Sequence, residues 1–182
     1  MICKLGTFKE QQADRDAIAD CLYLYTRAVD RCDSALLREV FWGDAQVYGS
    51  LFSGGRDDFV AYSTEEGKGF FDNMTHMISN IITRIQGQQA AVEAYFYGYH
   101  AAPAAANYGD LIIAGRYLDI LELRDDEWRI LEKTILFDWF REYPDCVDWE
   151  KGPMGSPATI TGSRNPDDRS YALFSRFNSA NR

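Results

Sequence analysis

Three side chains of this sequence could together perform acid–base chemistry: Asp30, His76 and His100. Asp30 lies at the end of a predicted helix, where the helix carries partial negative charge and a carboxylate is unfavourable unless water or a neighbour compensates it. The two histidines are the only ones in the chain, and each lies on a predicted strand. A carboxylate beside a neutral histidine makes a general base, because it orients the ring and stabilises the imidazolium that forms. If Asp30 faces a pocket, we expect it to meet one of these histidines.

The spacing of the two histidines predicts that their rings are neighbours on adjacent strands. A hairpin turn centred near Gln88 would place residue 76 opposite residue 100, because both lie twelve residues from it. Because side chains alternate along a strand, the predicted faces are His76, Ile78, Asn80 and Ile82 on one strand, and Val92, Ala94, Phe96, Gly98 and His100 on the next. The alternative for either histidine alone is a half-exposed structural residue at a strand end.

Other catalytic motifs are not found in the sequence. Asp30 and the two histidines could form a metal triad on paper, but the histidines have no HxH or HxxxH spacing. There is no GxSxG, no GxGxxG and no phosphate loop. The cysteines have no CxxC spacing, which favours reduced thiols in a cytoplasmic protein over a zinc site or disulfides: Cys3, Cys21, Cys32 and Cys146. We therefore predict no metal and no cofactor.

Composition limits the possible partners. The net charge of −9, without any run of Lys or Arg, argues against nucleic acid, whose binding depends on basic surface. No stretch approaches the roughly 20 apolar residues of a membrane span, and the N-terminus does not resemble a signal peptide, so we expect a cytoplasmic protein. Aromatic residues reach 14% of the chain. Some of these rings are core, and together they suggest a pocket for a hydrophobic, flat or polycyclic small molecule.

The elements that must position these residues begin with helices. The first helix is predicted over 13–32, with Leu22, Tyr25 and Val29 on its apolar face and Asp14 or Asp16 as its cap. Ser34 is predicted to cap a second helix, whose apolar face is Leu36, Leu37, Val40 and Phe41. A short strand over 43–50 and a third helical stretch over 54–71 follow, with Phe59 and Tyr62 as the buried side of the latter.

After residue 72 the hydrophobic period becomes alternating, and strands are predicted over 75–86, 90–103, 110–124 and 127–142. A tight turn at Asp125 and Asp126 joins the last two. Helices followed by a meandering antiparallel sheet indicate an α+β fold, in which a bent sheet wraps the helices as a cone-shaped barrel. We expect one domain over 1–143. Residues 144–182, rich in Gly, Pro, Ser and Asp with an apolar stretch at 171–177, form a predicted extension that packs on the barrel mouth or on a neighbouring subunit.

The order and spacing of several short motifs resemble a known family. These motifs are Tyr25-x4-Asp30, Tyr48 on the first strand, H-M-I-S-N from His76, and F-D-W-F-R ending at Arg141. The pattern over residues 10–143 resembles the SnoaL-like branch of the NTF2-like cone-shaped α+β barrels. It is most similar to the cofactor-free lyases of that branch: bile acid 7α-dehydratase, scytalone dehydratase and hexachlorocyclohexane dehydrochlorinase. The segment GSRNPDDRSY at 162–171 also resembles this branch.

The resemblance implies a role for each matching residue. Asp30 and His76 correspond to the general base, with Tyr25 and His100 as further catalytic groups and Tyr48 and Arg141 as substrate-binding groups. The dehydrochlorinase has a lysine where Tyr25 stands, which argues against halide elimination. Scytalone dehydratase has a tyrosine where Val29 precedes the aspartate, which argues against its substrate. The resemblance also implies a homo-oligomer, with a trimer favoured.

These features predict a cofactor-independent lyase that eliminates water, or a related small fragment, from a hydroxylated cyclic or aromatic compound such as a steroid ketone. A positioned acid or base contributes about 10²–10⁴-fold, so the substrate needs an electron-withdrawing or conjugating group beside the acidic carbon. The same base could serve a ketosteroid-type isomerase or a retro-aldol lyase that releases one carbon. The alternative outside catalysis is a binding or assembly subunit, such as the small subunit of a ring-hydroxylating oxygenase. Its cone would be packed shut and would lack an Asp–His contact.

Overall fold

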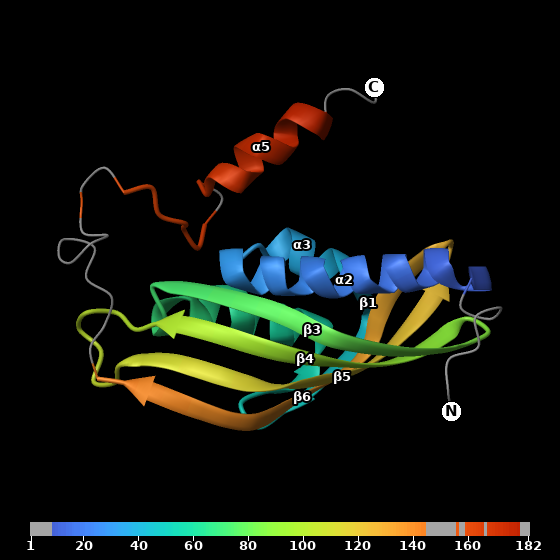
Figure 1. The fold of residues 1–182 in the computed structure, drawn as a ribbon, viewed down its shortest axis with the longest axis horizontal. Coiled ribbons are helices and arrows are strands. Elements are labelled where there is room, and N and C mark those ends of the chain that lie inside the picture. Colours follow the sequence, from blue (N-terminus) through green and yellow to red (C-terminus); the bar gives the residue numbers. More distant parts are fainter. Residues whose placement is uncertain (1–8, 145–155, 157–158, 166, 179–182) are drawn as a thin grey trace.

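The computed structural model describes residues 9–144, 156, 159–165 and 167–178 (Figure 1). Its elements are α2 (Gln12–Arg31), α3 (Ser34–Glu39), β1 (Phe41–Gly49), β2 (Ser53–Gly55), α4 (Arg56–Ala61), the π-helix η1 (Tyr62–Glu66), the 3₁₀-helix η2 (Gly67–Phe70), β3 (Asn73–Gln86), β4 (Gln89–Ala101), β5 (Asp110–Arg124), β6 (Glu127–Tyr143) and α5 (Arg169–Asn178). Helices lead and a sheet follows, which confirms the predicted α+β class. The predicted third helical stretch is divided into α4, η1 and η2, and β2 was not predicted.

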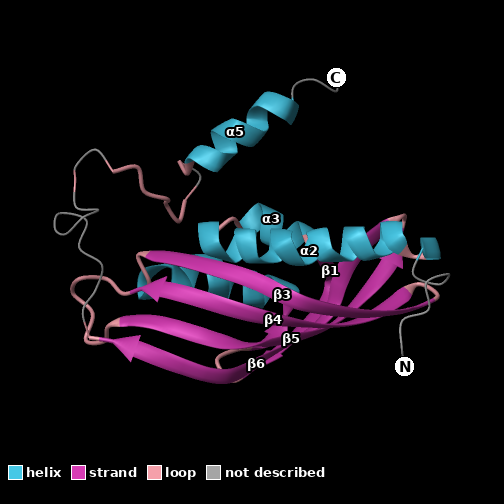
Figure 2. Ribbon diagram, in the orientation of Figure 1, coloured by secondary structure: helices cyan, strands magenta, loops and turns pink. Residues whose placement is uncertain are grey.

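The six strands form one sheet in the order β2-β1-β6-β5-β4-β3. All neighbouring strands are antiparallel except β1 and β6, which run parallel, so the sheet is mixed rather than antiparallel throughout as expected. No turn motif could reveal this pair, because the two strands are far apart in the chain. The sheet curves around α2, which lies along its concave side (Figure 2), and it does not close into a full barrel.

Helix α2 is placed by its apolar stripe. Ile18, Leu22 and Tyr25 are buried against the sheet, at the spacing of one helical face. The helix lies within one residue of the predicted 13–32. It begins after Gln11 without a side-chain cap, so neither predicted acid caps it, and Asp14 instead accepts a hydrogen bond from the Trp128 indole at 2.9 Å.

The connection between α2 and α3 corrects a second cap prediction. Cys32 ends α2 in the left-handed region, with φ 51°. Asp33, and not Ser34, caps α3: its Oδ1 accepts from the Leu36 backbone N–H at 3.0 Å. Asp33 is the better N-cap position because its backbone is extended there, while Ser34 is already helical.

The β3–β4 hairpin has a different register from the one predicted. Its turn is two residues long, so Gln86 pairs with Gln89, and a β-bulge between Ser79 and Ile82 shifts the pairing once more. As a result Gly98, rather than His100, lies opposite His76. The bulge also turns Ile82 outward, where it is 48% exposed, so its predicted place on the face of His76 is wrong.

The described part of the C-terminal extension contacts α2 and the start of α3. Arg27 donates to Ser170 Oγ at 3.0 Å, Tyr171 donates to Asp33 Oδ2 at 2.7 Å, and Arg31 lies 3.5 Å from Asp168. Helix α5 therefore lies beyond α2 and α3, on the side away from the sheet (Figure 1). The division of the chain after residue 143 remains a prediction. Within the described ranges, no helix is long and apolar enough to cross a membrane.

Candidate active site

Asp30 and His76 contact each other through two hydrogen bonds. Asp30 Oδ2 accepts from the His76 backbone N–H at 2.9 Å, and Asp30 Oδ1 lies 2.6 Å from His76 Nδ1. Strand β3 is the last strand of the sheet, so a backbone N–H on its free side is available to α2. The carboxylate near the helix end is thus compensated by the histidine, as the sequence suggested.

The geometry assigns the proton on His76. A carboxylate can only accept, so Nδ1 carries a hydrogen, and in the neutral ring Nε2 keeps its lone pair. The two side chains are 8% and 10% exposed, so water competes little for the pair. His76 also lines a cavity, while Asp30 lies behind it. This is an arrangement in which Nε2 can take up a proton from a bound molecule.

His100 is the neighbour of His76, although the two are not directly opposite. The ring centroids are 5.1 Å apart and the planes are perpendicular. A side chain at Gly98 would leave no room for this pair, because a Cβ there would lie 2.9 Å from carbon atoms of both rings. Burial, and then the charge of His76, lowers the pKa of His100 to about 3, so the ring stays neutral at physiological pH. Its buried Nδ1 has no hydrogen-bond partner in the part of the chain that the structure describes.

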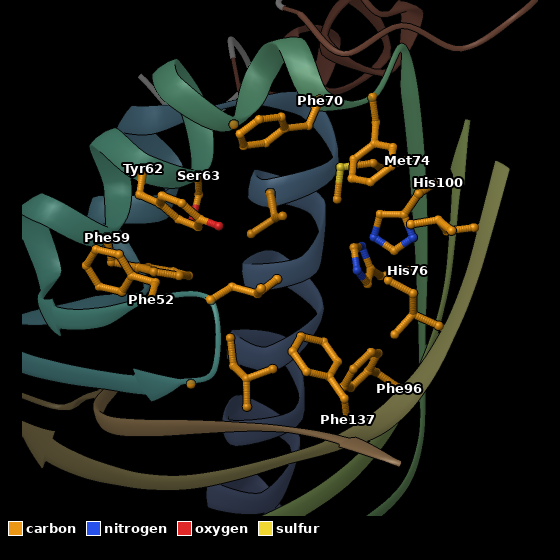
Figure 3. A pocket seen from close by; sticks show the side chains of 18 of the residues that line it. Phe52, Phe59, Tyr62, Ser63, Phe70, Met74, His76, Phe96, His100 and Phe137 are labelled. Atoms are coloured by element: carbon orange, nitrogen blue, oxygen red, sulfur yellow. The ribbon is translucent and has the colours of Figure 1, made fainter. Parts of the chain in front are cut away.

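The cavity beside these rings has a volume of about 250 Å³. Figure 3 shows Phe52, Phe59 and Tyr62 on one side of it, and His76 and His100 on the other, with Phe96 and Phe137 near the histidines. Its polar lining side chains are Tyr25, Ser50, Tyr62, Ser63, His76, His100, Tyr117 and Arg164. The cavity is therefore an apolar chamber with a small number of polar groups, as is typical of small-molecule sites.

Tyr25 reaches this cavity but is held in a packed aromatic cluster. Its ring contacts those of Phe41, Phe59 and Tyr117, and it is 3% exposed. Burial raises the pKa of Tyr25 well above its ordinary value, so the hydroxyl remains protonated. Tyr25 therefore lines the cavity and has a structural role in its wall, and the catalytic role implied by the resemblance remains a prediction.

Beneath Tyr25 lies a buried ion pair that sequence reasoning missed. Lys133 Nζ donates to both carboxylate oxygens of Asp119 at 2.9 Å, and both side chains are fully buried. The ammonium lies 4.1 Å from the centre of the Tyr25 ring and 4.0 Å from that of Tyr117. Both charged residues fall on inward positions of strands β5 and β6, a pattern that could have indicated the pair.

Tyr48 and Arg141, predicted to bind substrate, do not line the cavity. Tyr48 follows the buried Val47 on β1, so alternation turns it outward, where it is 46% exposed. Arg141 is turned away by a bulge: Phe137 pairs with Gly115 but Trp139 pairs with Ala114, so Asp138 is an extra residue. Without that bulge, Arg141 would share the face of Phe137.

Arg164 lines the cavity and was not predicted as a site residue. It comes from the C-terminal extension, where it is 6% exposed. The segment GSRNPDDRSY, noted above for its resemblance, contains this arginine and was the available signal. No set of three His, Cys, Asp or Glu side chains in the described part of the chain is arranged to hold a metal ion.

Comparison with known proteins places this geometry in a family. Residues 10–134 match the model of the SnoaL-like domain. A comparison with curated protein sequences gives no match. Similar solved structures include a putative scytalone dehydratase from Novosphingobium aromaticivorans (23% identity, TM-score 0.65, covering 73% of this chain and 89% of that one). A type 2 hexachlorocyclohexane dehydrochlorinase has 17% identity and a TM-score of 0.68, covering 82% and 97%.

A third similar structure is an NTF2-like superfamily protein from Salmonella enterica, with 13% identity and a TM-score of 0.63, covering 70% of this chain and 92% of that one. At these identities the structural likeness establishes the fold, and the family match covers more than half of the sequence. The chain belongs to the SnoaL-like domain family.

Proposed function

We propose that this protein is a cofactor-independent lyase that eliminates water, or a related small fragment, from a hydroxylated ring compound. The observation that carries the proposal is the hydrogen bond of 2.6 Å between Asp30 Oδ1 and His76 Nδ1, on the wall of an apolar cavity. Similar structures described as a putative scytalone dehydratase and as a dehydrochlorinase, both names of elimination enzymes, support the reaction class.

The proposed reaction assigns each proton. His76 Nε2 removes a proton from the carbon next to a carbonyl or a phenolic ring, and Asp30 stabilises the imidazolium that forms. A carbon–carbon double bond forms as the carbon–oxygen bond breaks, and the departing hydroxide takes a proton to leave as water. The pKa of His100 is about 3, so this ring is not protonated near neutral pH and has no acidic proton to donate. The imidazolium of His76 therefore donates the proton in this last step.

The size of the cavity restricts the substrate. A volume of about 250 Å³ is slightly below that of typical ligand pockets, roughly 300–1,000 Å³. We therefore favour a compact compound with one or two rings over a steroid ketone. The competing hypothesis of a binding or assembly subunit expects a closed aromatic core without an Asp–His contact, and both features of the described site argue against it.

The test is a screen of cyclic hydroxyketones and phenolic diols, in which absorbance reports the conjugated product. With an active compound, His76→Ala and Asp30→Asn are each expected to lower kcat/KM by at least 100-fold. The double variant should lose little more, because the two residues act as one unit. Asp72→Asn is the matched control, since it removes an exposed carboxylate near β3. Full activity in His76→Ala would refute the mechanism.

A further inference from the structure

Arg164 is a buried cation without a counter-ion in the described part of the chain. Its side chain lines the same cavity as His76 and His100. Nη1 donates to the backbone carbonyl of Phe71 at 2.8 Å and, more weakly, to that of Lys68 at 3.4 Å. Among the described residues, the buried Nε has no hydrogen-bond partner and no carboxylate forms an ion pair with the guanidinium. The group is therefore held in place by carbonyls but is not neutralised.

The charge of Arg164 acts on the centre of the candidate site. It contributes to the lowered pKa of His100, after burial and the charge of His76. Burial lowers the pKa of Arg164 itself, while Cys32 and then Asp30 oppose that shift. A guanidinium keeps its proton in proteins, so the cavity contains a permanent positive charge. An unpaired buried charge is costly, and an anionic oxygen in the cavity would relieve that cost.

We propose that Arg164 binds the substrate oxygen on which negative charge develops when His76 removes a proton. The inference rests on the proposed function and narrows its substrate class to a compact ring ketone, whose oxygen becomes an enolate oxygen when His76 removes a proton from the adjacent carbon. A phenolate is a stable mimic of that charge. The charges then balance at each stage. Before proton transfer, Asp30 and Arg164 have opposite charges around a neutral substrate. Afterwards, the imidazolium of His76 faces Asp30, and the oxyanion faces Arg164.

The surroundings favour this role. The apolar walls exclude water, so a fixed cation there stabilises a developing oxyanion more strongly than it would in solvent. The two backbone carbonyls hold the guanidinium before the substrate arrives, so little reorganisation is needed. A charge-assisted hydrogen bond from Nε–H to the oxyanion would also satisfy the unpaired atom.

Binding of 4-nitrophenol tests the proposal without any catalytic turnover. The phenolate absorbs differently from the phenol, and nitrobenzene provides a neutral compound that differs only by the hydroxyl group. In the wild-type protein, we expect the bound phenol to ionise at least one pH unit below the free phenol, which is a tenfold preference for the phenolate. Arg164→Gln should abolish that shift and weaken phenolate binding at least tenfold, while nitrobenzene binding changes less than twofold.

Arg31→Gln is the matched control. It tests whether a weaker contact of the C-terminal extension with α2, instead of the loss of a charge in the cavity, explains the effect of Arg164→Gln. Arg31 pairs with Asp168 in the same segment but does not line the cavity, so this variant should keep the phenolate preference. Equal weakening of both ligands by Arg164→Gln would show a purely structural arginine and overturn the inference, as would a wild-type protein without the phenolate preference. His76→Ala should retain the preference, so failure of the proposed catalysis and failure of this inference remain distinguishable.

Discussion

His100 touches His76, and burial decides the proton affinity of the His100 ring. Burial is the main reason that the pKa of His100 falls from 6.5 to about 3. The unfolded chain therefore binds a proton at His100 near pH 6.5, whereas the folded protein does so only near pH 3. It follows that His100 contributes stability that is present above pH 6.5 and is progressively lost as the pH falls toward 3.

We expect this linkage to be visible in urea unfolding between pH 7 and pH 4. The wild-type protein should lose up to about 1.4 kcal/mol per pH unit from His100 in this window. His100→Gln has no titrating ring there, so its free energy of unfolding should fall less steeply. Parallel stability curves for the two proteins would mean that His100 is not a buried neutral ring.

Gly98 is the residue that makes room for the two rings. In Gly98→Ala, the new methyl group would meet carbon atoms of both imidazoles at 2.9 Å. Overpacking of this kind costs about 1–3 kcal/mol, so we expect lower thermal stability together with reduced activity as His76 is displaced. Gly69→Ala is the matched control, because no atom lies within 4 Å of its Cβ position. Equal melting temperatures for the two variants would contradict the packing described.

At the scale of secondary-structure elements, strands β5 and β6 are joined across the core by Lys133 and Asp119. Lys133→Met alone would leave a buried carboxylate unpaired, and we expect it to destabilise the protein by about 3–5 kcal/mol. The double variant Lys133→Met/Asp119→Leu should recover most of that loss, because no buried charge remains. Urea unfolding of the three proteins measures the difference. A double variant no more stable than the single one would show that the pair itself is required.

Helices and turns with strong local sequence signals were predicted well, and the pairing and register of strands were not. The apolar stripe placed α2 within one residue, and Asp125 and Asp126 do form the β5–β6 turn, with φ of 51° and 63°. The contact of Asp30 with a histidine followed from the electrostatics of a helix end. The predicted inward position of Ile82 was wrong, and Arg141 lies outside the cavity, because β-bulges depend on pairing with other strands. Tyr48 lies outside the cavity because it alternates with the buried Val47. Arg164 was missed because no periodicity marks it.

At the scale of the whole molecule, the outer face of the sheet exposes several large apolar and aromatic side chains. Its exposed large side chains include Met77, Tyr95, Tyr97, Leu118 and Trp139. Tyr97 and Trp139 pack against each other across strands, with ring centroids 6.1 Å apart. An exposed apolar patch is typical of an interface between proteins, and the homo-oligomer, with a trimer favoured by the resemblance, remains a prediction.

Sedimentation of the intact chain tests that expectation. The wild-type protein should sediment as a homo-oligomer, and Tyr97→Glu should reduce its mass, because a carboxylate would be buried in the centre of the contact. Tyr23→Glu is the matched control, since Tyr23 is comparably exposed on α2 but lies on another surface. A monomeric wild-type protein would refute the expectation, and an unchanged mass for Tyr97→Glu would place the contact elsewhere.

The bulge at Asp138 has a consequence for how such a protein can change over evolutionary time. Asp138 is one extra residue between the pairs Gly115–Phe137 and Ala114–Trp139, so loss of its codon would leave a regular strand in which Trp139 and Arg141 still face outward. A strand without such a bulge responds differently, because a change of one residue exchanges its two faces beyond that point. The bulge therefore allows this strand to lose one residue while the same side chains face the ligand. Related domains of this fold could differ in length at this point while they keep the same specificity.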